Sequence, residues 1–333
     1  MNRFAYVQPR SFEEAAAALA EKRFTLPVLK AGGMDVVDHL KEGLIRPDAL
    51  VNIKRLRSQP GGPAVTESGG KIRIEATATM AEIAASEVVR RLAPVLGLSV
   101  GNAASPQVRN IGTAAGNLLQ RPRCWYYRHE QFDCLKKGGS TCYAVEGENQ
   151  YHAIFGGGPC HIVHPSNLAP ALMVCDAVVH LTGSERKSLP VADLFHGPDK
   201  GVRSEHTLEP GEVITHITCE TRPASGFYAV KEKQSFDWPL VAASVALELD
   251  GANIRSARVC AGAVAPTPWP LPNVEAALRG VSLDDADALR RACAVAAEGA
   301  TPMSGNAYKV RLLPVAVRRA ALIASGRKTE VDA

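Results

Sequence analysis

Two turns built from small residues constrain the fold of this chain most strongly. The first, AGGMD at residues 31–35, lies between an apolar strand-like segment and a helical pattern. The second, within residues 105–120, brings Gly112, Thr113, Gly116 and Asn117 close together. Both turns leave backbone N–H groups open near a helix start, where an anion such as a diphosphate is favoured. Neither has the G-x-G-x-x-G spacing, so the pair indicates a nucleotide-binding fold that is not of the Rossmann type. For either turn alone the alternative is an ordinary glycine turn.

The chain around these turns predicts a mixed α and β protein. Ser11 with Glu14, and Thr79 with Glu82, have the spacing of capping boxes, and residues 77–97 predict one helix. Towards the C-terminus, two strands meet at a tight turn and two amphipathic helices follow. We therefore expect sub-domains over about 1–55 and 56–220, a C-terminal domain over about 226–325 and a frayed tail over 326–333.

Composition excludes several classes of protein. The net charge of +4 comes from scattered Lys and Arg, whereas a nucleic-acid footprint needs a concentrated basic face. No apolar run approaches the roughly 20 residues that span a bilayer. The first residues lack the basic-then-apolar order of a secretory signal. We therefore expect no nucleic acid, no membrane span and a cytoplasmic location, in which the eight cysteines are thiols or metal ligands rather than disulfides.

A polar loop over residues 121–165 carries four of these cysteines, at 124, 134, 142 and 160. Four thiolates in one loop repel one another unless a metal neutralises them, and a metal would also supply the energy that orders the loop. The C-x9-C-x7-C-x17-C spacing matches no short zinc or ferredoxin pattern. A structural zinc and unligated thiols remain as alternatives. The loop histidines are expected to be hydrogen-bonding or exposed residues rather than ligands, and Cys175, Cys219, Cys260 and Cys293 to be buried small hydrophobes.

The segments AGGxD, VRNxGTxxGNL, HPSNLAPALMVCDAVVHL and GNAYKVRLLPVAVRRAAL occur in an order that resembles a known family. That family is the FAD-binding subunit or domain of the molybdenum hydroxylases, which include xanthine dehydrogenase, and the resemblance covers nearly the whole chain. It implies an α+β fold. An N-terminal α/β part would have the FAD-binding fold of p-cresol methylhydroxylase and vanillyl-alcohol oxidase, and a C-terminal α+β domain would be like that of CO dehydrogenase flavoproteins.

The resemblance also implies which residues contact FAD, and no catalytic residue acts on the organic substrate. The diphosphate would be wrapped by Val28, Leu29, Lys30, Ala31, Gly32, Gly33, Met34, Asp35 and Val36. The diphosphate and ribityl region would meet Thr113, Gly116, Asn117 and Leu118, and the cofactor would also meet Ser166 and Asn167. Ile214 would touch the flavin ring, Lys231 would lie near its polar edge and Asp237 would close the far side. Three residues depart from the family pattern: Met34, Ala115 and Asn167.

The cysteine loop is similar to that of bacterial aldehyde oxidoreductases of the periplasmic type, and more loosely to that of 4-hydroxybenzoyl-CoA reductase. This likeness implies that Cys124, Cys134, Cys142 and Cys160 hold a [4Fe–4S] cluster. The aromatic run at residues 125–127 would line a route between cluster and flavin, or would pack the loop onto the domain or onto a partner.

The function implied is that of the flavin-carrying subunit of a heterotrimeric molybdenum aldehyde oxidoreductase. Its partners would be a small [2Fe–2S] subunit and a large molybdenum-cofactor subunit, with electrons passing through FAD to an external small-molecule or protein acceptor. Export on a partner's twin-arginine signal is an alternative to the cytoplasmic location. Two alternative functions remain. The chain would be a subunit of an enzyme of the 4-hydroxybenzoyl-CoA reductase type, or an assembly protein that lacks FAD and whose cysteine loop is held by a structural zinc ion.

Overall fold

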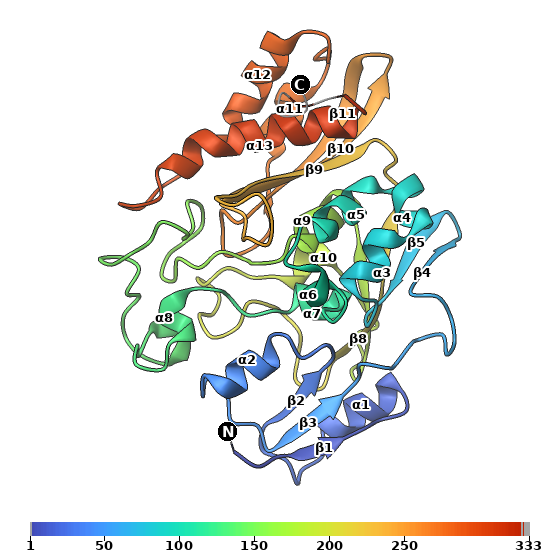
Figure 1. Cartoon of the computed structure of the whole chain (residues 1–333), viewed down its shortest axis with the longest axis vertical. Coiled ribbons are helices and arrows are strands. Elements are labelled where there is room, and N and C mark those ends of the chain that lie inside the picture. Colours follow the sequence, from blue (N-terminus) through green and yellow to red (C-terminus); the bar gives the residue numbers. More distant parts are fainter. Residues whose placement is uncertain (1, 328, 330–333) are drawn as a thin grey trace.

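Three β-sheets organise the chain in the computed structural model, which describes residues 2–327 and 329 (Figure 1). The first sheet has the strand order β1-β3-β2, and both pairs are parallel. Its strands are β1 (Ala5–Val7), β2 (Pro27–Lys30) and β3 (Ala49–Asn52). Parallel neighbours need crossover connections, which helices α1 (Phe12–Leu19) and α2 (Val36–Lys41) help to supply. The expected succession of strand, glycine turn and helix over residues 27–41 is therefore present.

The second sheet is antiparallel, with the order β4-β5-β8-β6-β7. Its strands are β4 (Val65–Ser68), β5 (Lys71–Glu75), β6 (Val178–Thr182), β7 (Ser188–Pro190) and β8 (Val213–Glu220). The helices of this part are α3 (Met80–Ala85), α4 (Glu87–Leu92), α5 (Pro94–Gly101), α6 (Pro106–Arg109), α7 (Ala114–Leu118), α9 (Leu168–Val174) and α10 (Val191–Leu194). All of these helices except α6 share one apolar core with the first sheet, so the two glycine-bearing turns belong to the same packed unit.

The expected single helix over residues 77–97 is wrong, because the chain breaks it twice into α3, α4 and α5. Ser86 has extended backbone angles and its hydroxyl accepts from the N–H of Val89, which starts a new helix. Pro94 lacks the N–H that a continuing helix needs. The capping box of Thr79 and Glu82 is confirmed at the start of α3. At Ser11 only half of the box forms, because the Glu14 carboxylate accepts from Arg10 instead.

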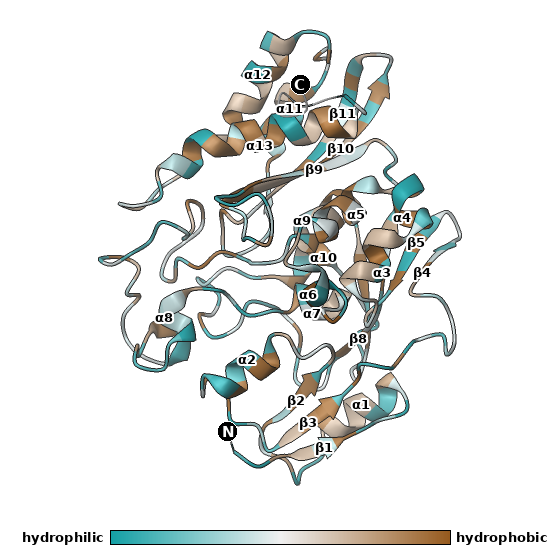
Figure 2. Cartoon of the chain, viewed as in Figure 1, coloured by the Kyte–Doolittle hydropathy of each residue, from teal (hydrophilic) through white to brown (hydrophobic). Residues whose placement is uncertain are grey.

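The C-terminal sheet has the order β12-β11-β10-β9 and is antiparallel. Its elements are β9 (Ser225–Val230), β10 (Val241–Asp250), β11 (Asn253–Gly262), β12 (Trp269–Pro270), α11 (Pro272–Leu278), α12 (Ala286–Ala294), the 3-10 turn η2 (Val295–Ala297) and α13 (Tyr308–Ala324). Figure 2 shows apolar brown on β2 and β3, whereas α4 at the surface is polar teal. Helix α13 and the inner faces of β9–β11 enclose a second apolar core. Residues 328 and 330–333 of the expected frayed tail lie outside the described residues.

The loop that carries the four cysteines is mostly irregular, with short helices at α8 (Trp125–Arg128) and η1 (Leu135–Lys137). We expect it to project from the second sub-domain, and for its second half this is wrong. Ile154 and Phe155 are buried in the C-terminal core, where the Phe155 ring stacks on Trp269 at 5.3 Å. Figure 1 shows the green loop lying between α2 and α13.

Over the part of the chain that the structure describes, every helix is too short or too polar to span a bilayer.

Candidate cofactor site

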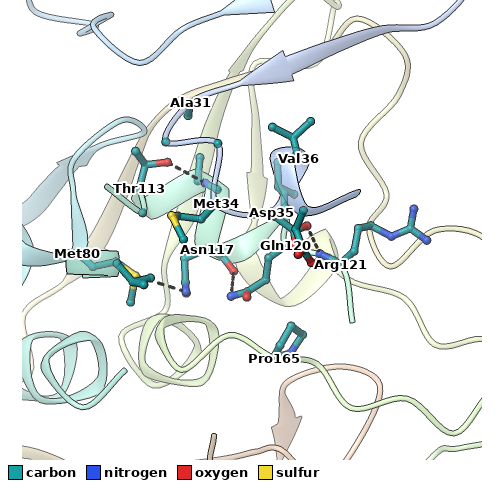
Figure 3. Close-up of a pocket in the computed structure, with 18 of the residues that line it drawn as sticks. Ala31, Met34, Asp35, Val36, Met80, Thr113, Asn117, Gln120, Arg121 and Pro165 are labelled. Carbon is teal, nitrogen blue, oxygen red and sulfur yellow. Dashed lines mark hydrogen bonds between the residues drawn. The ribbon is translucent and has the colours of Figure 1, made fainter. Parts of the chain in front are cut away.

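A cavity of about 620 Å³ lies where the first sheet, the second sheet and the loops that cross them meet (Figure 3). This volume is within the range of small-molecule and cofactor sites. The cavity wall contains most of the residues expected to meet FAD: Val28, Leu29, Ala31, Gly32, Gly33, Met34, Asp35, Val36, Thr113, Gly116, Asn117, Asn167, Ile214 and Asp237. The two small-residue turns, about 80 residues apart in the sequence, thus share one cavity.

Four expected residues are not in the cavity wall: Lys30, Leu118, Ser166 and Lys231. Leu118 is buried in the apolar core, and the Lys231 ammonium donates to the carbonyl of Asn102 at 2.6 Å. The Ser166 hydroxyl donates to the side-chain oxygen of Asn117 at 2.6 Å and accepts from Ala169. Ser166 therefore orients a residue of the cavity wall rather than facing the cavity itself.

The first turn meets the second backbone to backbone. A Cβ atom on Gly32 would lie 2.0 Å from the carbonyl oxygen of Ile111, which is far inside van der Waals contact. Gly33 has a φ of +84°, a left-handed conformation that side chains disfavour. Both positions therefore need glycine, one for close approach and one for backbone angle. Ala115, which departs from the family pattern, lies inside α7 with an ordinary helical backbone, so an alanine there is harmless.

The second turn presents polar groups to the cavity in a fixed arrangement. The Thr113 hydroxyl caps α7 by accepting from the N–H of Gly116 at 3.3 Å. The Asn117 amide is held by Ser166 and by the sulfur of Met80, and Gln120 donates to the Asn117 carbonyl at 2.9 Å (Figure 3). These contacts fix the direction of the Asn117 side chain, so the site does not have to order it on binding.

A group of charged residues lies at one end of the cavity, and no local sequence pattern predicts it. Asp35 ends the first turn, and its carboxylate accepts from the Arg121 N–H at 2.8 Å (Figure 3). It also accepts from the Arg128 guanidinium at 2.7 Å. Burial opposes ionisation of this carboxylate, but the Arg121 N–H and the Arg128 cation outweigh it, so the pKa of Asp35 lies below its ordinary value. Other unanticipated wall residues are Asp38, His39, Gln120, Arg121, Arg123 and Trp238. No periodic pattern marks them, because they come from separate segments: α2, residues 120–123 and residue 238.

The four loop cysteines converge on a second, much smaller cavity of about 10 Å³. Cys124, Cys134, Cys142 and Cys160 all line it, together with aromatic and histidine side chains. A hydrogen bond between Cys142 and Cys160 lowers the pKa of Cys142 to about 5 and raises that of Cys160, so one thiolate is favoured in this pair. Burial raises the pKa of Cys124 to about 11. The other four cysteines are buried in apolar surroundings, as expected.

The donor set of this small cavity fits a thiolate-bound metal centre, but its space is too small for a cluster as the cysteines stand. About 10 Å³ is room for roughly one water molecule, so a cluster requires the thiols to move apart. Among residues 2–327 and 329, no three or more His, Cys, Asp or Glu side chains are close enough together to hold a metal ion. Of the loop histidines, His152 approaches Cys124, with Nε2 3.3 Å from the sulfur. Burial and the Lys309 charge lower the pKa of His152 to about 4, so the imidazole is neutral.

The start of α13 holds the cysteine loop from the C-terminal side. The Lys309 ammonium is almost fully buried and donates to the carbonyls of Tyr151, His152 and Ala263 at 3.0, 3.0 and 2.8 Å. Burial lowers the pKa of Lys309 to about 7, whereas three carbonyl acceptors match the three N–H donors of the charged form. Asn306 adds bonds to the carbonyls of His152 and Ala153. This part of the loop is therefore fixed by long-range contacts.

Comparison with known families agrees with the architecture. Residues 2–219 match the family described as the FAD binding domain in molybdopterin dehydrogenase, and residues 226–324 match the CO dehydrogenase flavoprotein C-terminal domain. The cavity lies within the first of these ranges except for its rim at residues 237–239. Fold and site together define an FAD-binding oxidoreductase subunit.

Individual relatives narrow the assignment. The chain is 36% identical over 281 residues to the aldehyde oxidoreductase FAD-binding subunit PaoB of Escherichia coli K12, covering 82% of this chain and 86% of that protein. It is 26% identical to the carbon monoxide dehydrogenase medium chain of Afipia carboxidovorans, with 97% of each chain covered. The solved carbon monoxide dehydrogenase from Hydrogenophaga pseudoflava shares the fold, with a TM-score of 0.75 at 24% identity and 98% and 99% coverage. The chain belongs to the family of FAD-binding medium subunits of the molybdenum hydroxylases, as its motifs predict.

Proposed function

We propose that this chain is the electron-transfer subunit of a heterotrimeric molybdenum aldehyde oxidoreductase, with FAD in the large cavity and a metal centre on the four loop cysteines. The observation that carries the FAD placement is the close packing of Gly32 against Ile111, which joins two small-residue turns into one backbone cradle. The likeness to an aldehyde oxidoreductase FAD-binding subunit supports the aldehyde reaction.

In this proposal the chain's own residues bind and orient FAD, and FAD when bound supplies reversible electron acceptance. Gly32 and Gly33 would leave room for the diphosphate to approach the backbone, and Thr113, Gly116 and Asn117 would also contact the cofactor. The positive charge of Arg123 and Arg128 offsets the Asp35 carboxylate, which would otherwise repel a diphosphate. Ile214 would supply an apolar contact to the ring system, and Asp237 would close the site.

The four cysteines would hold a [4Fe–4S] cluster as thiolates. The convergence of all four on one cavity supports a metal centre, and the spacing resembles that of aldehyde oxidoreductases. The second candidate is a structural zinc on the same thiolates, which the small volume of this cavity favours because one ion needs less space than a cluster.

The partners would be a small [2Fe–2S] subunit and a large molybdenum-cofactor subunit, which would oxidise the aldehyde. Electrons would then reach FAD from the [2Fe–2S] partner and leave to an external acceptor. A subunit of the 4-hydroxybenzoyl-CoA reductase type would use the opposite direction of flow. A cytoplasmic location, or co-export with a partner that carries a twin-arginine signal, belongs to the same proposal.

The test is a cofactor analysis of the chain purified anaerobically with its partners. We expect one FAD per chain, and about four iron and four sulfide beyond the partner's clusters, as a thiolate-held [4Fe–4S] centre requires. Zinc in place of this iron would show that the four cysteines hold a structural ion rather than a cluster. Absence of FAD would refute the electron-transfer function and leave an assembly role.

A single substitution tests the cysteine site separately. Cys142→Ser is expected to remove most of the metal bound by this chain and to expose the loop to protease, because the thiolate that the Cys160 bond favours is lost. Metal content and limited proteolysis measure this. Cys293→Ala is the matched control, since Cys293 is buried in the C-terminal core away from the loop. Unchanged metal content and protease resistance in Cys142→Ser would refute the metal site.

A further inference from the structure

One short segment forms part of both cavity walls. Within residues 120–128, three side chains line the large cavity and three line the small cysteine cavity: Gln120, Arg121 and Arg123 for the first, and Cys124, Tyr126 and Tyr127 for the second. The two sites therefore share a stretch of backbone. A group that fixes Cys124 also limits where Arg121 and Arg123 lie.

Arg128 holds this segment in shape. Its guanidinium donates from Nε to the carbonyl of Pro122 at 2.8 Å and from Nη2 to the carbonyl of Arg121 at 3.0 Å. The backbone N–H of Arg128 donates to the carbonyl of Cys124 at 2.9 Å and closes the single turn of α8. The side chain is only 13% exposed, so these bonds are shielded from competing water.

The same guanidinium reaches the glycine turn of the large cavity. It forms ion pairs with Asp35 at 2.7 Å and with Asp38, which lie at the end of the turn and on α2. Asp35 also accepts from the Arg121 N–H, so both of its oxygens are bound to the loop. Because α2 begins directly after Asp35, the direction of the turn depends on this pairing.

A second connection runs parallel to the first. His39, which lines the large cavity, bonds through Nε2 to the hydroxyl of Tyr127 at 3.0 Å, and Tyr127 lines the cysteine cavity. The other ring nitrogen of His39 bonds to the carbonyl of Asp35 at 2.8 Å. Backbone and side chain of Asp35 are thus both tied to the α8 segment.

We propose that Arg128 is a positioning residue that links the two cofactor sites, so that the metal centre on the cysteines and FAD bind cooperatively. A centre bound to Cys124 holds α8, α8 presents Arg128 to Asp35 and Asp38, and these hold the glycine turn in the geometry that FAD needs. The coupling is reciprocal, so bound FAD also raises retention of the metal centre. This inference rests on the proposed function, which supplies both groups.

The first experiment uses the full chain without substitutions. FAD is removed, and the chain is either kept metal-free or reconstituted anaerobically with iron and sulfide. Titration of each form with FAD, followed by flavin fluorescence, is expected to give about tenfold tighter binding to the iron-loaded form, within the usual range of coupling between sites. Equal FAD affinity of the two forms overturns the proposal.

Variants then assign the coupling to Arg128. In Arg128→Gln we expect weaker FAD binding and, above all, the same FAD affinity with and without iron. Arg128→Lys keeps the charge but loses the two-pronged guanidinium, so it is expected to retain only part of the difference. Arg90→Gln is the control, since Arg90 forms an exposed ion pair with Glu87 on α4 and should preserve the full difference. A difference that persists in Arg128→Gln overturns the role of Arg128.

Iron uptake and FAD affinity together distinguish failure of the proposed linkage from failure of the proposed cluster. A wild-type chain that takes up no iron refutes the cluster and the linkage together, whereas a chain that takes up iron but binds FAD equally well refutes the linkage alone. If Arg128→Gln does not fold, Asp38→Asn replaces it, because Asp38 is 42% exposed and tolerates the change. Asp38→Asn is expected to reduce the difference in FAD affinity, and an undiminished difference counts against the proposal.

Discussion

Replacing Gly32 with alanine is expected to abolish FAD binding at micromolar FAD. The new Cβ would lie 2.0 Å from the Ile111 carbonyl oxygen and 2.8 Å from its carbon, and neither atom belongs to a flexible side chain. The two turns must separate to relieve this clash, which opens the cradle between them. Overpacking of this kind costs about 1–3 kcal/mol of stability, so the chain is expected to remain folded while the site is lost.

Two measurements check this result. Flavin fluorescence titration gives the FAD affinity, and thermal unfolding gives the stability. The matched control is Gly101→Ala at the end of α5, where a Cβ would meet Ala84 at an ordinary 3.9 Å, so FAD affinity should be preserved. Full FAD occupancy in Gly32→Ala would rule out this cavity as the diphosphate site.

Lys309→Met is expected to lower the free energy of unfolding by about 3 kcal/mol, because three carbonyl acceptors lose their donor. Methionine has similar length and removes the charge, so the loss isolates the hydrogen bonds from the packing of the side chain. Two of these carbonyls belong to the cysteine loop, at Tyr151 and His152. The loop should therefore become sensitive to protease before the rest of the protein unfolds.

Urea denaturation measures the loss of stability, and limited proteolysis reports the loop. Lys200→Met serves as the control, since Lys200 is exposed and its substitution should change neither quantity. A Lys309→Met chain with wild-type stability would show that the buried ammonium does not hold the loop. Metal content should also fall in Lys309→Met, because the same segment carries His152 next to Cys124.

Local sequence patterns predicted much of the fold. The succession of strand, glycine turn and helix at residues 27–41 and the capping box at Thr79 both depend on neighbouring residues, and the structure contains them. The prediction of one helix over residues 77–97 was wrong, although the apolar pattern continues through the whole segment. Ser86 caps a new helix and Pro94 lacks a backbone N–H, and these two local effects outweigh the pattern.

For the candidate sites too, some features could be predicted from local sequence and others could not. The sequence alone shows that glycine occupies positions 32 and 33, that four cysteines share one loop and that the family motifs occur in order. These features are properties of single positions or of short spacings. The structure brings most of the expected FAD residues into one wall, but it places Ser166 behind Asn117 and directs Lys231 elsewhere.

The contacts between groups that are distant in the sequence follow from the packing of the folded chain. Arg128 and Asp35 are 93 positions apart, and Lys309 and His152 are 157 apart. Such contacts leave no periodic signal in the sequence, because they depend on how three sheets and a long irregular loop pack together. The glycine turn could be predicted from the backbone freedom of its residues, whereas the arginine that holds it, and through it the link between the two sites, follows from packing alone.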